Sequence, residues 1–175
     1  QQLRRLRDAG VTRYQHNLET SARFFPHIVT THTFDERVAT VRNAKAQGFI
    51  VCSGGILGLG ETREDRIDMA LTLKELNVDV IPVNALMPIP GTPLGDATPI
   101  TPTEVLKTIA IFRIIMPGKI IKLAGGRESI LRDFQATAFL AGANGMITGG
   151  YLTRRGRDVE EDQRLAAEVR NAWKR

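Results

Sequence analysis

Cysteine is almost absent from this sequence, since the 175 residues contain a single one, Cys52. One cysteine can neither form an internal disulfide nor complete a zinc site by itself. No apolar run approaches the ~20 residues that a membrane-spanning helix needs, and no secretory signal peptide opens the chain. These absences predict a cytoplasmic protein that is held together by a hydrophobic core and has no membrane partner.

Aromatic residues are also scarce, with one tryptophan and two tyrosines beside a formal net charge of +5. Much of the positive charge lies near the two ends of the chain, and at the C-terminal end it alternates with acidic residues. That alternation is typical of a solvated helix face. Nucleic-acid binding would require a basic patch with aromatic platforms, so we expect no nucleic-acid partner.

Apolar strands alternate with amphipathic helices along the whole chain, which we expect to form one domain over residues 1–175. Such alternation predicts a parallel sheet with right-handed crossovers. Two architectures fit five units: a doubly wound sheet, or part of an eight-unit (β/α) barrel. We expect strands at about 11–16, 49–52, 80–85, 120–124 and 145–148, and helices at about 34–47, 62–76, 102–116, 125–142 and 159–173.

Three of these helices carry start signals in the sequence. Thr33 precedes Glu36 by three residues, and Thr62 precedes Asp65 in the same way, a spacing that indicates capping boxes. Pro102 follows a threonine and stands at a first helical position, where proline is favoured. The chain itself opens in the middle of a helical pattern without a methionine, so we expect it to be part of a longer protein.

Polar residues collect where the predicted strands end. In a parallel sheet the carboxyl ends of the strands meet at one edge, where barrel enzymes build their active sites. Cys52 is open to three interpretations: a metal ligand, a nucleophile or a small core residue. The other polar residues could equally satisfy turns or form ion pairs. They are His16, Asn17 and Glu19 after the first strand, Asn84 in the third, and Arg127 after the fourth.

A glycine-rich segment at 54–61 follows Cys52, and we expect its glycines to end the strand. This segment lacks the Lys-Ser/Thr pair of a P-loop, and its glycines do not fit the dinucleotide-binding fingerprint. It offers backbone that a ligand can approach closely. Glu61 closes the segment, either as a surface acid or as part of a ligand cradle.

These motifs, in this order, resemble the biotin synthase family of radical S-adenosylmethionine enzymes. The resemblance implies strands 4 to 8 and the C-terminal helix of an incomplete (β/α)8 TIM-type radical SAM barrel. It also implies sulfur insertion into dethiobiotin, with a 5′-deoxyadenosyl radical made at a 4Fe–4S cluster and sulfur donated by a 2Fe–2S cluster. The segments that carry the resemblance are 14–21, 29–37, 51–61, 83–84, 91–94, 124–128 and 141–144.

The resemblance assigns roles to individual residues. Cys52 and Arg127 match the ligands of the 2Fe–2S cluster. Gln15 stands where the family usually has asparagine, at a substrate contact, and Asn84 matches a contact to dethiobiotin. The positions that match S-adenosylmethionine contacts are Asn17 and Glu19 at the ribose, Arg37 at the methionyl carboxylate, Gly55, Ile56 and Glu61 in the backbone cradle, and Met87 on the adenine; Asn17 also approaches the substrate.

The Cys-x3-Cys-x2-Cys motif of the family is absent from this sequence. We therefore expect the 4Fe–4S ligands to come from a missing N-terminal part of the barrel, in a homodimer, and the isolated chain to be inactive. Two alternatives stay open: a lipoyl synthase-like sulfur insertion, because that family shares a His-Asn-Leu-Glu-Thr segment, and a non-catalytic α/β module that binds a nucleotide-like ligand.

Overall fold

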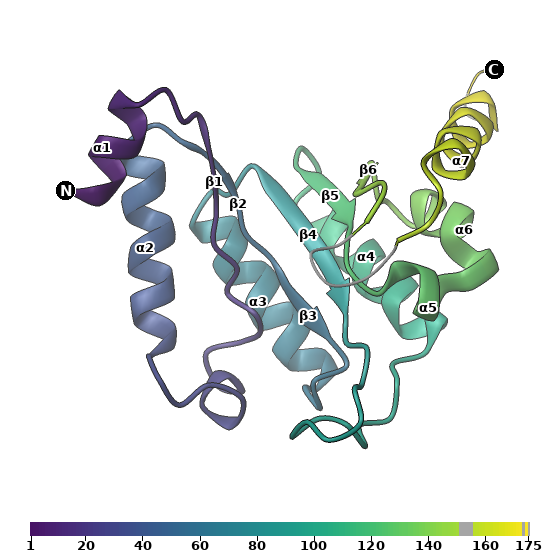
Figure 1. The fold of residues 1–175 in the computed structure, drawn as a ribbon, viewed down its shortest axis with the longest axis horizontal. Helices are drawn as coiled ribbons and strands as arrows, with labels where there is room; N and C mark the ends of the chain where they lie inside the picture. The colour runs from purple at the N-terminus through teal and green to yellow at the C-terminus, as the bar shows by residue number, and fades with distance from the viewer. Residues whose placement is uncertain (151–155, 173, 175) are drawn as a thin grey trace.

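A computed structural model of the chain describes residues 1–150, 156–172 and 174 (Figure 1). Its centre is a 6-stranded sheet in which every strand pair is parallel. The neighbours follow the order β1-β2-β4-β5-β6, and β3 pairs with β4. The strands are β1 (Arg13–Gln15), β2 (Ile50–Cys52), β3 (Gly55–Leu57), β4 (Val80–Ala85), β5 (Ile120–Leu123) and β6 (Gly145–Met146).

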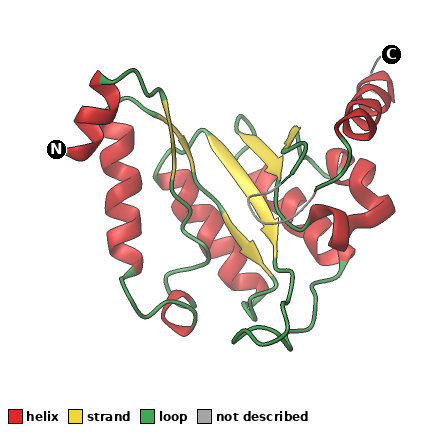
Figure 2. Cartoon of the chain, in the orientation of Figure 1, coloured by secondary structure: helices red, strands yellow, loops and turns green. Residues whose placement is uncertain are grey.

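Helices connect successive strands except β2 and β3, and α3 and α4 lie behind the sheet in Figures 1 and 2. The spatial order of the strands follows their order in the chain without a reversal, with β2 and β3 both pairing with β4. A doubly wound sheet reverses its order at a switch point, so this arrangement is that of a barrel segment. The helices are α1 (Gln2–Asp8), α2 (Phe34–Ala46), α3 (Arg63–Glu75), α4 (Pro102–Ile115), α5 (Arg127–Leu131), α6 (Gln135–Leu140) and α7 (Val159–Ala172), with short 3-10 turns η1 (Phe25–His27) and η2 (Arg132–Phe134).

The predicted helix starts are confirmed. The hydroxyl of Thr33 accepts a hydrogen bond from Glu36 N, and the Glu36 carboxylate accepts one from Thr33 N. Thr62 and Asp65 form the same reciprocal pair at the start of α3. Each pair satisfies two backbone donors that a helix start would otherwise leave unpaired.

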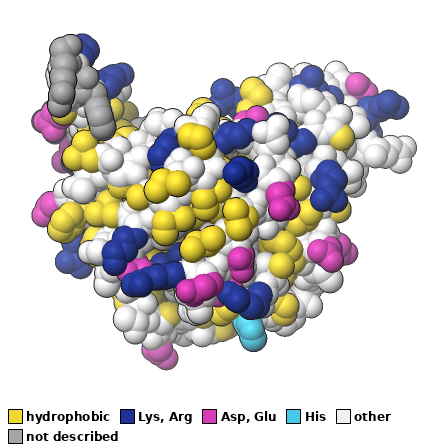
Figure 3. Space-filling model, turned by 180° about the vertical axis from the view of Figure 1, so that it is seen from behind, with side chains coloured by type: hydrophobic (Ala, Val, Ile, Leu, Met, Phe, Trp, Pro, Cys, Tyr) yellow, Lys and Arg dark blue, Asp and Glu magenta, His cyan; other side chains and the backbone are white. Residues whose placement is uncertain are grey.

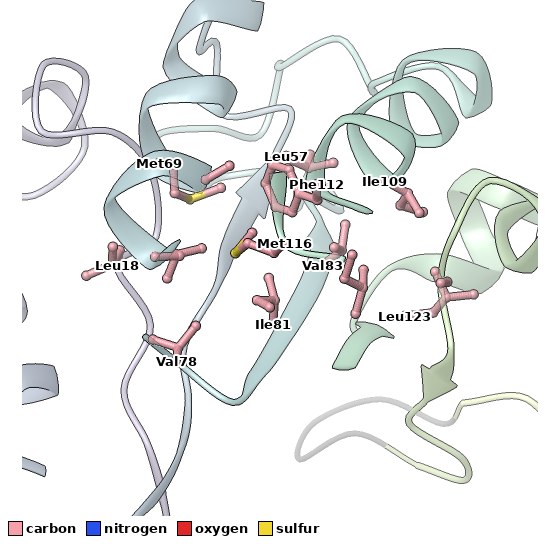
Figure 4. Close-up of a cluster of buried hydrophobic side chains, with 14 of the residues drawn as sticks. Leu18, Leu57, Met69, Val78, Ile81, Val83, Ile109, Phe112, Met116 and Leu123 are labelled. Atoms are coloured by element: carbon pink, nitrogen blue, oxygen red, sulfur yellow. The ribbon is translucent and has the colours of Figure 1, made fainter. Parts of the chain in front are cut away.

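Side chains alternate along each strand between a buried face and an open face. The buried face packs on the helices, and Figure 4 shows Ile81 and Val83 of β4 beside Phe112 of α4. Ile81 is 0% exposed and Phe112 is 1% exposed. The open face carries polar and apolar side chains that are exposed or half-buried: Arg13, Gln15, Ile50, Cys52, Val80, Asn84, Ile120 and Lys122.

From the helix side, charged side chains surround an apolar area (Figure 3). Leu71 in α3 and Ile114 in α4 are exposed apolar side chains of these helices. Among the residues that the structure describes, no helix has both the length and the apolar character of a membrane span.

The structure differs from the expected elements in two places. The second strand ends at Cys52 as expected, but an unpredicted strand, β3, begins at Gly55 and pairs with β4 in the same register as β2. The break falls where Pro82 of β4 comes close to Gly54, and proline offers no N–H to the ladder. The predicted helix at 125–142 is broken into α5, η2 and α6, and Arg132 stands at the break with φ +47.

A prediction follows from the close approach at Gly54. A Cβ at this position would collide with the backbone oxygen of Pro82. We expect Gly54→Ala to lower the free energy of unfolding by about 1–3 kcal/mol, the usual cost of overpacking a core. Gly118→Ala is the matched control, because no atom lies within 4 Å of its added Cβ, and it should change stability by less than about 0.5 kcal/mol. If urea titrations gave the same change in the free energy of unfolding for both variants, the sheet would have to relax around the added methyl group at Gly54.

Candidate functional site

The carboxyl ends of neighbouring strands are joined by side-chain and backbone contacts, as the parallel order requires. Glu19 forms an isolated bridge with Gly55. Asn84 Nδ2 donates to Gly55 O at 3.1 Å, and Gly125 N donates to Asn84 Oδ1 at 3.0 Å. The segment after β1, Asn84 near the end of β4 and the turn after β5 therefore meet around β3, and the predicted convergence of polar residues is present in part.

Arg37 organises the polar side chains after β1. Its Nη1 donates to Asn17 O at 2.8 Å and lies 3.5 Å from Glu19 Oε1. Its Nε donates to His32 Nε2 at 2.9 Å, and its guanidinium lies over the Phe25 ring at 5.7 Å. Sequence reasoning missed His32, although it stands five residues before Arg37, at the end of the loop that enters α2.

Glu19 is a costly residue for the fold. It has φ +71, in the left-handed region that non-glycine residues seldom adopt. Its Oε2 is buried without a hydrogen-bond partner among the described residues. Burial raises the pKa of the Glu19 carboxyl, while Arg37 and the Asn17 amide pull it down to a lesser extent. Strain, an unsatisfied buried oxygen and a raised pKa together mark a group kept for a ligand rather than for stability.

The glycine segment brings backbone close to this group. A Cβ at Gly55 would collide with the carbonyl of Glu19, and Ile56 N donates to Glu19 O at 2.9 Å. Glu61 folds the rest of the segment, because its carboxylate accepts from Leu59 N at 2.7 Å and from Arg66 Nε at 2.8 Å. Its side chain is only 2% exposed. The buried Glu61 carboxylate thus holds the glycine segment in its conformation by accepting hydrogen bonds from the segment's own backbone.

Cys52 is the last residue of β2, as expected, but it lies deeper than the end of β4 and so does not sit at the mouth of the fold. It is opposite Gln15 on one side and Val80, the first residue of β4, on the other. Ile56 is opposite Asn84, four residues further along, which corresponds to about 13 Å of extended strand. The site therefore has an upper level around Glu19 and Asn84 and a lower level around Cys52.

Lys122 is the cation of the lower level. Its Nζ lies 3.8 Å from Cys52 Sγ. Burial raises the pKa of the Cys52 thiol, and the nearby Lys122 ammonium partly offsets that rise. Sequence reasoning missed Lys122, although a lysine inside the apolar run 120–124 could have pointed to it.

Arg127 is bound to side chains of α6 and α7. Its guanidinium forms an ion pair with Asp162 of α7 and donates a hydrogen bond to Gln135 of α6. The Arg127 side chain is 1% exposed and that of Asp162 is 0% exposed. In this structure the expected cluster ligand Arg127 is thus held by protein partners.

Met87 follows β4 in the loop that the resemblance places near the adenine. Its sulfur accepts a hydrogen bond from Ser129 Oγ at 3.5 Å. It lies between two surface pockets, one of about 630 Å³ and one of about 360 Å³. The smaller pocket is largely apolar, with Leu86, Ile89 and Leu94 in its wall, which suits the face of a flat aromatic group.

A S-adenosylmethionine site fits these residues, because the upper level offers an unsatisfied carboxylate oxygen, a guanidinium and a close-packed glycine backbone. An iron–sulfur cluster fits them only in part. No group of three or more His, Cys, Asp or Glu side chains suited to a metal occurs in the part of the chain that the structure describes. Cys52 could supply one thiolate, so a cluster there needs further ligands from outside these residues.

Comparisons with known proteins define the class. Residues 1–73 match the radical SAM superfamily, and residues 82–169 match the Biotin and Thiamin Synthesis associated domain. Methylornithine synthase superposes with a TM-score of 0.77 at 24% identity, over 95% of this chain and 53% of that one. HydG, a maturase of the FeFe hydrogenase, gives 0.77 at 18% identity, over 95% and 41%. At these identities the likeness shows the fold alone, which is a partial radical SAM barrel.

The second match covers just over half of the chain, which therefore belongs to the Biotin and Thiamin Synthesis associated domain family. Its relatives include the biotin synthase of Carboxydothermus hydrogenoformans, 57% identical over 94% of this chain and 50% of the relative. The biotin synthase of Heliobacterium modesticaldum is 55% identical over 96% and 52%. The chain spans about half the length of these curated relatives. The resemblance seen in the motifs is thereby confirmed.

The raised pKa of Glu19 generates a prediction for Glu19→Gln. An acid whose pKa is raised by folding favours the folded state below its unfolded pKa, about 4.3 for glutamate, and loses that contribution as the pH rises through the folded pKa. At pH 7 the wild type therefore bears the cost of a buried charge. We expect Glu19→Gln to melt at a higher temperature than wild type at pH 7, and the difference to vanish near pH 3.5.

Glu36→Gln provides a control of opposite sign. Backbone and side-chain hydrogen bonds from Thr33 lower the pKa of Glu36, so its ionised form favours folding at neutral pH. Glu36→Gln should therefore melt at a lower temperature than wild type at pH 7. Thermal unfolding of a full-length protein that includes these residues measures both. A lower melting temperature for Glu19→Gln at pH 7 would mean that the Arg37 ion pair outweighs the burial of Glu19.

Proposed function

We propose that this chain is the part of a biotin synthase that carries the dethiobiotin site, much of the S-adenosylmethionine site and one ligand of the 2Fe–2S cluster. The observation that carries the proposal is the division of the open sheet face into two levels. Asn84 and the Glu19–Arg37 pair form the upper level. Cys52 lies four register positions below Asn84, about 13 Å of extended strand, and Lys122 Nζ lies 3.8 Å from its Sγ. Relatives named biotin synthase, 51–57% identical to the chain, support it.

The upper level would hold S-adenosylmethionine. The unsatisfied Oε2 of Glu19 can accept hydrogen bonds from ribose hydroxyls, with Asn17 beside it. Arg37 can pair with a carboxylate through charge-assisted hydrogen bonds. The backbone at Gly55 and Ile56 leaves room for close contact, as glycine permits. Met87 would pack on the adenine.

The lower level would hold the 2Fe–2S cluster through the Cys52 thiolate. A cluster bound by thiolates carries net negative charge, so the Lys122 ammonium is a suitable neighbour. We therefore propose Lys122, as a charged neighbour and not as an iron ligand, for the cationic position beside the cluster in place of Arg127, because Arg127 would have to leave Asp162, a buried charge, to reach a cluster. When bound, the 4Fe–4S cluster with S-adenosylmethionine supplies the hydrogen-abstracting radical, and the 2Fe–2S cluster supplies the sulfur.

Dethiobiotin would lie between the two levels. Gln15 is opposite Cys52, and Asn84 is opposite Ile56, so their side chains bracket this space on the open face. The Asn84 amide already bonds Gly55 and Gly125, which leaves one N–H and one lone pair for a substrate. The 4Fe–4S ligands would come from a preceding part of the barrel. We propose a homodimer in the cytoplasm.

The cluster assignment predicts the behaviour of Cys52→Ala in a full-length protein that includes these residues. After anaerobic reconstitution, we expect this variant to lose most of its 2Fe–2S absorption and to form no biotin from dethiobiotin, because a thiolate ligand is gone. Ser53→Ala is the matched control, since Ser53 is buried next to Cys52 with no partner for its hydroxyl among the described residues. It should retain iron, sulfide and turnover.

Two further variants separate Lys122 from Arg127. Lys122→Met should lower turnover about tenfold or more, as loss of an outer-shell contact does at metal sites, and should change the visible spectrum. Arg127→Met should instead lower the melting temperature without changing that spectrum.

Full 2Fe–2S content and full turnover in Cys52→Ala would make the cysteine a core residue and remove the basis of the cluster proposal.

A further inference from the structure

The last helix, α7, is attached to the barrel by a buried ion pair. Its outer face is strongly charged, as its sequence predicts, but Asp162 is 0% exposed and Leu165 is 8% exposed. Asp162 pairs with Arg127, which is 2% exposed and also donates to Gln135. In Figure 1, α7 lies beside α5 and α6 at one end of the sheet. Full burial of both charges distinguishes this contact from a surface salt bridge.

Glu128 and Arg157 complete the charged surroundings of this pair. Glu128 Oε1 lies 3.4 Å from Arg127 Nε, and Arg157 Nε lies 4.0 Å from Asp162 Oδ1. Glu128 Oε1 also accepts from Arg157 N at 3.5 Å. Two cations and two carboxylates thus join the start of α5 to the start of α7.

Arg127 directly follows the turn that touches the upper level of the site. Gly126 has φ +81 and packs so closely on the Ala85 carbonyl that a Cβ would collide with it. Ala85 N donates to Gly125 O at 2.8 Å, and Gly125 N donates to Asn84 Oδ1 at 3.0 Å. The position of the 125–126 turn therefore sets the orientation of the Asn84 amide.

We propose that Asp162 is a positioning residue, and that α7 acts through the Arg127–Asp162 pair as a clamp on the 125–126 turn and on Asn84. Its consequence for substrate binding rests on the proposed function, in which Asn84 faces dethiobiotin. Removing the Asp162 charge takes away the fully buried counter-charge of Arg127 and leaves the carboxylate of Glu128, whose side chain is 24% exposed. The poorer compensation of the buried guanidinium favours local opening of the start of α5. The turn then loses the anchor that follows it directly in the chain.

Hydrogen exchange of the full-length holoprotein tests the clamp without reference to activity. We expect Asp162→Asn to speed amide exchange in peptides that cover 120–131 and 80–88 by about tenfold or more. Glu161→Gln is the matched control, because Glu161 is the neighbouring acid, with a side chain 46% exposed and an ion pair to Arg157. Glu161→Gln should leave both peptides unchanged. Asp162→Glu keeps the charge and should restore much of the protection.

Kinetics then test the effect on the site. We expect Asp162→Asn to raise the KM for dethiobiotin more than it lowers kcat, with unchanged 2Fe–2S content. Faster exchange in α7 alone, with 80–88 unchanged, would overturn the clamp.

If Asp162→Asn does not fold, Gln135→Met is the alternative variant, because it removes only one hydrogen bond to Arg127. It should give a smaller increase in the rate of amide exchange at the same two peptides, and no increase there would overturn the proposal too. Absence of biotin formation by the wild type would count against the proposed function, while the exchange result would still decide the clamp.

Discussion

The close backbone approach at Gly54 and Gly55 is the constraint on which the candidate site depends. Without side chains at these positions, the chain from Ile50 to Leu57 can run as one interrupted strand against β4. That course leaves Cys52 at the level where β4 begins and carries Ile56 to the level of Asn84. The separation between a lower thiol level and an upper carboxylate level thus follows from two glycines facing Pro82 and Glu19.

Local features of the fold could be predicted from the sequence, and contacts between distant segments could not. The helix starts at Thr33 and Thr62 depend on residues three positions away, so the sequence contains all that is needed. The continuation of the strand past Gly55 depends on β4, and the partners of Arg127 lie in α6 and α7. Motif order pointed to the family, yet it could not show that Lys122 lies beside Cys52.

Buried charges in this chain fall into two kinds with opposite energetic effects. Asp65 is desolvated, but hydrogen bonds from Ser21, Thr62 and Arg23 more than compensate and hold its pKa well below the ordinary value. Glu19 is also desolvated, and its contacts fail to compensate, so its pKa rises. Both oxygens of the Asp65 carboxylate accept hydrogen bonds within the protein. Glu19 Oε2 has no hydrogen-bond partner among the described residues, so Glu19 costs stability and keeps an oxygen available to a ligand.

The open face of the sheet is where the costly Glu19 carboxylate lies and where a ligand would bind. Its lower part combines apolar side chains, such as Ile50 and Ile120, with the Cys52–Lys122 pair, and its upper part carries Glu19, Arg37 and Asn84. A closed barrel would cover the apolar side chains and strengthen every electrostatic contact by excluding water. In the proposed reaction, radical formation and sulfur donation require separate centres with the substrate between them. Two levels on one sheet face meet that requirement, because β2, β4 and β5 hold Cys52, Asn84 and Lys122 at fixed spacing.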